Sequence, residues 1–159
     1  MSPTDTFNPE LFLNATTEEA LSTEFVVLPE GEYTGVIESL NNDSFKAFDI
    51  KKGENAGKKA YRMDLAIAVN DETGSLKEEM GRAPKARHRF LLDMTDGGAL
   101  DFGKGKNVQL GRLRAAVGQN KPGVPWAPSM LGGQPIRFKI KHEVYEGRTQ
   151  ANVQDVVAY

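Results

Sequence analysis

Residues 136–142 read IRFKIKH, and this stretch decides how the fold of the whole chain is interpreted. Its apolar residues, Ile136, Phe138 and Ile140, alternate with cationic residues. Alternation with a period of two is typical of a half-buried β-strand, with apolar side chains toward a core and charged side chains toward water. The outward face of this strand carries three cations and no carboxylate. It is therefore either a solvated face or a surface that meets a negatively charged partner.

Four other strands are expected from the same pattern. The clearest of them spans residues 61–69, where large apolar side chains alternate from Tyr61 to Val69. The polar segments on either side of it, 41–59 and 70–85, are expected to be long loops. The remaining three strands are expected at residues 32–40, at residues 86–94 and after a turn at Glu146-Gly147.

One helix is predicted among these strands, at about residues 106–117. Leu110, Leu113 and Val117 recur at helical spacing, and Gly118 follows at the position of a left-handed C-cap. The resulting order is three strands, the helix and two strands. This order predicts an all-β fold with one main helix: a five-stranded, OB-fold-like Greek-key barrel with the helix between the third and fourth strands. Other small barrels and sandwiches share much of the same order.

The charges are distributed unevenly along the chain. The net charge is −2, but the first 32 residues contain seven acids and no lysine or arginine. The rest of the chain therefore holds all 20 bases against 15 acids. Such asymmetry points to a polyanionic partner, and an acidic solubilising tail is the alternative. We interpret residues 1–28 as an acidic N-terminal arm, with a short helix beginning at Thr16 or Thr17, and residues 29–159 as the OB-fold-like domain.

Several kinds of site are disfavoured by the sequence. The chain has no cysteine, which excludes disulfides and thiolate metal sites, and no apolar run approaches the roughly 20 residues that cross a bilayer. Residues 98–105, GALDFGKG, resemble a phosphate-binding loop, but Gly105 lacks the hydroxyl that would bind magnesium. His88 and His142 are in register with core positions, which favours packing over metal ligation. The sequence thus predicts no catalytic residue, no cofactor and no metal site.

Cations recur in the outward phase of four expected strands. A lysine-rich edge can also protect a sheet from aggregation, but that accounts for one strand only. Single-stranded nucleic acids bind to a positive groove with aromatic side chains, because each linkage carries a phosphate and each base a π-face. Phe45 and Trp126 are further candidates for such aromatic platforms, although a lone tryptophan in a proline-rich loop more often fills a core edge. The predicted nucleic-acid-binding residues are Arg62, Arg87, Arg89, Arg137, Lys139, Lys141 and Arg148, with Phe48, Tyr61 and Tyr145 as stacking platforms.

Short motifs follow one another along residues 28–157: LPEGEYTGVIESL, GKKAYRMDLAIAV, RHRFLLDM, GRLRAAVG and MLGGQPIRFKIKHEVYEGRTQANV. In this order they resemble the phage-encoded OB-fold single-stranded DNA-binding proteins. The resemblance implies binding of single-stranded DNA without sequence preference, in phage DNA replication or recombination and without catalysis. It places the protein in the cytoplasm of the infected bacterial host. Many replicative single-strand binders end in an acidic tail that recruits partners, whereas this chain ends DVVAY and its acids lie in the arm.

The expected partners are single-stranded DNA and, through the resemblance, phage replication or recombination proteins. No membrane partner is expected, and self-association is left open. The alternative function is an OB-type protein-interaction module of a phage replication or virion complex, with no direct binding of nucleic acid.

Overall fold

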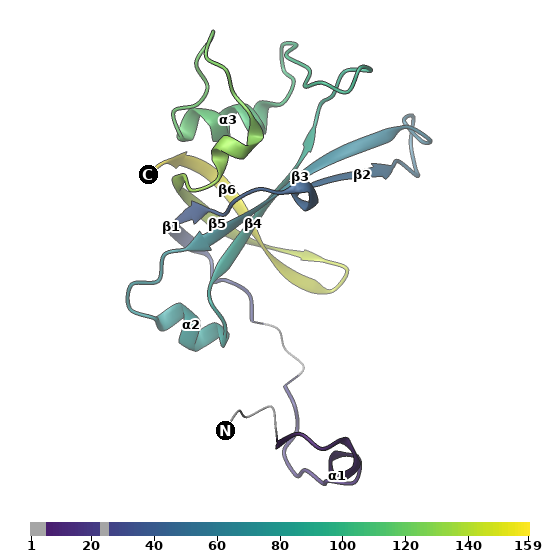
Figure 1. Cartoon of the computed structure of the whole chain (residues 1–159), viewed down its shortest axis with the longest axis vertical. Helices are drawn as coiled ribbons and strands as arrows, with labels where there is room; N and C mark the ends of the chain where they lie inside the picture. The colour runs from purple at the N-terminus through teal and green to yellow at the C-terminus, as the bar shows by residue number, and fades with distance from the viewer. Residues whose placement is uncertain (1–5, 23–25) are drawn as a thin grey trace.

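The computed structural model describes residues 6–22 and 26–159 of the chain. These residues form mainly antiparallel β-structure with a few short helices (Figure 1). The strands are β1 (Gly31–Ile37), β2 (Phe45–Asp49), β3 (Lys59–Val69), β4 (Lys85–Leu92), β5 (Pro135–Tyr145) and β6 (Arg148–Ala158). The α-helices are α1 (Pro9–Leu13), α2 (Ser75–Met80) and α3 (Val108–Ala116), and the 3₁₀ turns are η2 (Asn42–Ser44) and η3 (Pro128–Leu131).

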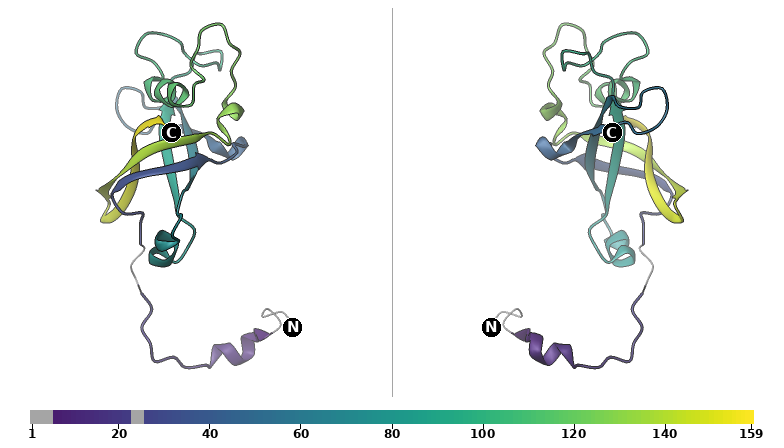
Figure 2. Two further views of the ribbon diagram at one scale, coloured as in Figure 1. Left: turned by 90° about the vertical axis from the view of Figure 1, so that its left-hand side faces the viewer. Right: turned by 90° about the vertical axis from the view of Figure 1, so that its right-hand side faces the viewer.

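β3 is the central strand of the sheet. One of its edges pairs with β4, while the other pairs with β2 toward its start and with β1 toward its end. The sheet continues from β1 to β5 and then to β6. β4 and β6 approach each other in space, but within residues 6–22 and 26–159 no ladder of backbone hydrogen bonds joins them. The sheet is therefore strongly curved without being a closed barrel (Figure 2).

The expected count of five strands is wrong, because the sheet has six, and the expected barrel is present only as a curved sheet that does not close. The sixth strand is β2, which lies in the segment expected to be a polar loop and pairs Phe45 with Met63. All five residues of β2 are exposed, so the segment lacks the buried apolar face by which a strand is recognised in a sequence. The other expected loop, residues 70–85, contains α2, which buries Met80 in the core.

The alternation predicted for the main strands is confirmed. In β3, Met63, Leu65 and Ile67 are buried. In β5 the alternating apolar residues of the predicted core face, which begin at Ile136, are buried as well. The predicted helix is also present, two residues shorter at its start and one at its end. It packs Leu110 and Leu113 into the core, and Gly118 after it has a φ of +71°, the left-handed conformation expected there.

The arm has its helix at a different place from the one expected. α1 begins at Pro9 because the side chain of Asn8 accepts the backbone N–H of Glu10 at 3.0 Å, and proline is favoured in the first turn. The prediction of a helix starting at Thr16 or Thr17 is wrong, since residues 14–20 form no helix. No helix in the described part of the chain is long and apolar enough to span a membrane.

Candidate nucleic-acid interface

Several of the predicted nucleic-acid-binding residues lie together on the outer surface of β2, β3 and β4. Strand register places Arg62 between Lys46 of β2 and Leu91 of β4, and it places Asp64 opposite Arg89. Directly opposed residues in an antiparallel pair point to the same face. We define the β2–β3–β4 face by Lys46, Phe48, Arg62, Asp64, Arg87, Arg89 and Leu91. Lys85 at the start of β4 shares their phase, but its Nζ is paired with Glu38 at 3.0 Å and it is not counted in the face.

Asp64 organises the charges of the β2–β3–β4 face. The Arg62 guanidinium donates to both Asp64 carboxylate oxygens, from Nε at 2.7 Å and from Nη2 at 3.0 Å. The Nε of Arg89 lies 3.8 Å from the same carboxylate. Arg87 is exposed and forms no ion pair within the described residues. The face therefore carries four cations against one acid, and Arg87 and Lys46 are its least restrained cations.

The other predicted cations lie on a second surface, the β5–β6 face, which consists of Arg137, Lys139, Lys141, Tyr145 and Arg148. β1 separates the two faces in the sheet, with Glu32 opposite Lys139 and Thr34 opposite Arg137. Because neighbouring strands lie about 4.8 Å apart, β3 and β5 are separated by roughly 10 Å. The seven predicted cations thus form two groups on the outer surface of the curved sheet.

The predicted aromatic platforms do not share one face. Phe48 lies opposite Ala60 in the outward phase, whereas Tyr61 lies opposite Ala47 in the phase that faces the core further along β3. Phe45 is in the inward phase with Tyr61. Both Phe48 and Tyr61 are about two-fifths exposed. Of the two, only Phe48 belongs to the β2–β3–β4 face.

The hairpin that joins β5 and β6 brings together two predicted residues. Tyr145 lies directly opposite Arg148 at its tip and is 62% exposed. Lys139, further along β5, has its Nζ 4.0 Å from an oxygen of Asp155. In Figure 1 this hairpin and the β2–β3 ribbon both project to the right from the rest of the sheet.

Of the two alternatives that the sequence left for Trp126, the structure shows packing at a core edge. Its indole N–H donates to the side-chain oxygen of Gln119 at 2.9 Å, and the Arg114 guanidinium carbon lies 4.2 Å from the ring centroid. The ring packs against the hydrophobic core and is only partly exposed. These contacts explain a lone tryptophan in a proline-rich loop without a nucleic-acid ligand.

Three residues of the β2–β3–β4 face were missed as site residues by sequence reasoning. Asp64 lies two residues from Arg62 in one strand, so the alternation alone placed it on the same face. The phase of Lys46 could not be predicted because its segment is expected from the sequence to be a loop. Leu91 has the same outward phase as Arg87 and Arg89, and this phase was visible in the sequence. In the structure its side chain is 60% exposed.

The two histidines have structural surroundings. His88 is largely buried with its ring centroid 4.9 Å from that of Phe90, and burial lowers its pKa to about 4. His142 Nε2 lies 2.7 Å from the carbonyl oxygen of Leu28, and its backbone N–H donates to Glu30. Within the part of the chain that the structure describes, no three histidine, aspartate or glutamate side chains converge on a metal position.

Comparison of the chain with models of protein families gives no match, and neither does comparison with curated protein sequences.

Proposed function

We propose that this protein binds single-stranded DNA without sequence preference through the β2–β3–β4 face, in phage DNA replication or recombination. The observation that carries the proposal is the concentration on this face of four cations and the exposed apolar side chains of Phe48 and Leu91. Cations bind the phosphates and Phe48 offers a surface on which a base can stack.

The connectivity of the sheet supports the choice of this face. If β2 is set aside as part of a loop, the order of the remaining strands and α3 is the one expected of a five-stranded, partly open barrel, with β3 and β4 in the places of its second and third strands. In OB-folds the face of strands two and three binds oligonucleotides, together with the loops that follow strands one and four. Here those loops correspond to the segment that contains β2 and to the hairpin at Tyr145 and Arg148.

The proposal also gives a role to the ion pairs around Asp64. Two arginines share one carboxylate, so their side chains are held in place before any ligand arrives. A preorganised cation loses less conformational freedom on binding a phosphate than a free one does. Asp64 at the same time reduces the net charge of the face and so weakens its attraction for DNA.

The test is fluorescence anisotropy of a labelled oligothymidine with the full chain, repeated from about 10 to 200 mM salt. Affinity is expected to fall steeply with salt, and mixed-sequence single strands are expected to bind as well as oligothymidine. Equal binding at both salt concentrations would refute the proposal, as would tighter binding of duplex DNA. Absence of binding at low salt would favour a protein-interaction module.

A further inference from the structure

The arm presents an apolar cluster that contacts nothing in the body. Phe7, Leu11, Phe12 and Leu13 are each 66% exposed or more, and the ring centroids of Phe7 and Phe12 lie 5.6 Å apart. Residues 6–22 also carry three acids and no base. Clustered exposed apolar side chains on a soluble chain mark a surface that another surface covers.

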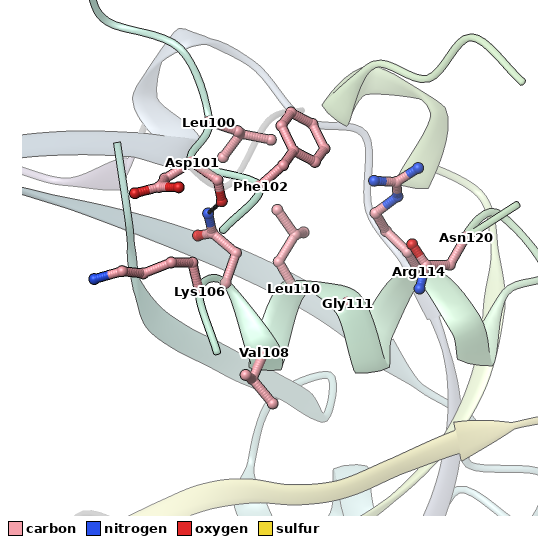
Figure 3. Close-up of a pocket in the computed structure, with 10 residues that line it drawn as sticks. Leu100, Asp101, Phe102, Lys106, Val108, Leu110, Gly111, Arg114 and Asn120 are labelled. Carbon is pink, nitrogen blue, oxygen red and sulfur yellow. Dashed lines mark hydrogen bonds between the residues drawn. The ribbon is translucent and has the colours of Figure 1, made fainter. Parts of the chain in front are cut away.

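Residues 29–159, here called the body, have a hollow of about 210 Å³ between the loop before α3 and the helix itself, lined about equally by polar and apolar side chains. Its apolar lining includes Leu100, Phe102, Val108 and Leu110, and Figure 3 shows Leu110 directed from α3 toward Leu100 and Phe102. Phe102 is 83% exposed, so its ring is available to a ligand of the hollow. Residues 98–121 carry five cations against the single acid Asp101.

The wall of the hollow is held rigidly by Asn107. Its side-chain oxygen accepts the backbone N–H of Asp93 at 2.8 Å, and its amide donates to the carbonyl oxygens of Asp93 and Asp101 at 2.8 and 3.0 Å. Asp101 in turn accepts the backbone N–H of Gly103 through its carboxylate. These bonds fix the loop that carries Phe102, so the hollow is formed before any ligand arrives, which lowers the entropic cost of binding.

We infer that α1 of one copy of this protein docks in the hollow beside α3 of a second copy. The two surfaces complement each other, because α1 exposes apolar side chains beside the acid Glu10, and the hollow combines apolar side chains with the cations Lys106 and Arg114. Phe12 and Leu11 supply the side chains that cover Phe102 and Val108.

The geometry selects a second copy over the arm's own body. Figures 1 and 2 show the arm leaving the body at the end opposite to α3. Fourteen residues lie between Leu13 and Leu28, whose side chain is in the core, and fully extended they bridge at most about 54 Å. A body of this size is about 36 Å across, so the path around half of it measures about 57 Å. Even fully extended, the arm falls just short of its own α3, whereas a neighbouring molecule can present its α3 at any distance, which favours the second copy.

An arm at one end and a hollow at the other make a head-to-tail contact. Such a contact does not close on itself unless the rotation forms a ring, so copies associate in rows. This inference does not depend on the proposed function, since the contact forms without DNA. If the proposed function also holds, a row of copies would coat a single strand cooperatively.

The test is analytical ultracentrifugation of the full chain without DNA over a wide range of concentrations. The arm variant Phe12→Ser and the hollow variant Phe102→Ser change the same residue type at exposed positions, and Leu21→Ser is the matched control in the arm outside α1. Wild type and Leu21→Ser are expected to associate, and each Phe variant to associate about 10- to 100-fold more weakly.

A mixture of the two Phe variants provides the decisive observation. Each variant keeps one intact half of the contact, so the mixture is expected to form pairs that grow no further. Circular dichroism of each variant confirms that it folds. Wild type that stays monomeric up to about 1 mM would overturn the inference. So would association that either Phe variant leaves unchanged, or a mixture that forms no pairs although wild type associates.

Discussion

The double variant Arg87→Gln and Arg89→Gln tests whether β4 contacts the phosphates of DNA. Both side chains are exposed on the β2–β3–β4 face, and their removal leaves the Arg62–Asp64 ion pair intact. Exposed substitutions of this kind usually change the free energy of unfolding by less than about 0.5 kcal/mol. The variant therefore removes two cations from the face without unfolding the sheet.

The magnitude follows from the release of counterions. Each phosphate contact on a single strand contributes about 0.7 to the slope of log affinity against log salt concentration. Loss of two contacts therefore lowers the slope by about 1.4 and weakens binding about 25-fold at 0.1 M salt, or about 2 kcal/mol. The assay is fluorescence anisotropy of a labelled oligothymidine over a series of salt concentrations.

The matched control is the double variant Lys139→Gln and Lys141→Gln. It removes the same charge from the β5–β6 face, which lies beyond β1 at about one Debye length at 0.1 M salt. We expect it to weaken binding less than about threefold. Equal losses in the two variants would refute the assignment of binding to the β2–β3–β4 face, and a larger loss in the lysine variant would move the site to the β5–β6 face.

Three further predictions concern individual residues. Asp64→Asn removes the one acid of the β2–β3–β4 face and is expected to tighten binding of oligothymidine about fivefold at 0.1 M salt. Weaker binding would mean that Asp64 favours DNA binding by orienting Arg62 more than it disfavours binding through its negative charge. Phe48→Ala is expected to weaken that binding by about 1–3 kcal/mol and Tyr61→Ala to leave it nearly unchanged, since the two side chains lie on opposite faces of the sheet. A larger loss for Tyr61→Ala than for Phe48→Ala in the same titration would mean that bases stack on Tyr61. His88 has its pKa lowered by burial to about 4, below the ordinary 6.5 of the unfolded chain, so its contribution to stability is complete above pH 6.5 and is lost as the pH falls toward 4. Urea unfolding of wild type and His88→Gln should therefore differ in slope against pH, with up to about 3 kcal/mol lost from wild type through this residue; parallel curves would contradict the burial of a neutral imidazole.

Strand phase was predictable from sequence because it depends only on local alternation. In β3 and β5 the apolar positions are buried in the order that the sequence indicated. A slip of one residue would expose every one of them, so the core determines the phase strongly. α3 was predictable for a similar reason, since Leu110 and Leu113 recur at helical spacing and Gly118 ends the helix.

β2 and α1 were not predictable in this way. β2 buries none of its residues, and its pairing with β3 comes from backbone hydrogen bonds that any polar sequence can form. α1 is a single short turn capped by Asn8, while the expected helix at Thr16 had similar local capping signals. Where no buried face distinguishes the alternatives, weak local preferences leave the position of an element undecided.

The sequence by itself determined the charge asymmetry between arm and body, the phase of each main strand and the outward position of every predicted cation. Only the tertiary structure decided which cations share a surface, because strand order in a sheet depends on contacts between residues far apart in the chain. It placed Arg87 and Arg89 on one face with Arg62 and Asp64, and it separated them by β1 from the cations of β5. The register of β2 against β3 likewise decided that Phe48 and Tyr61 point to opposite faces.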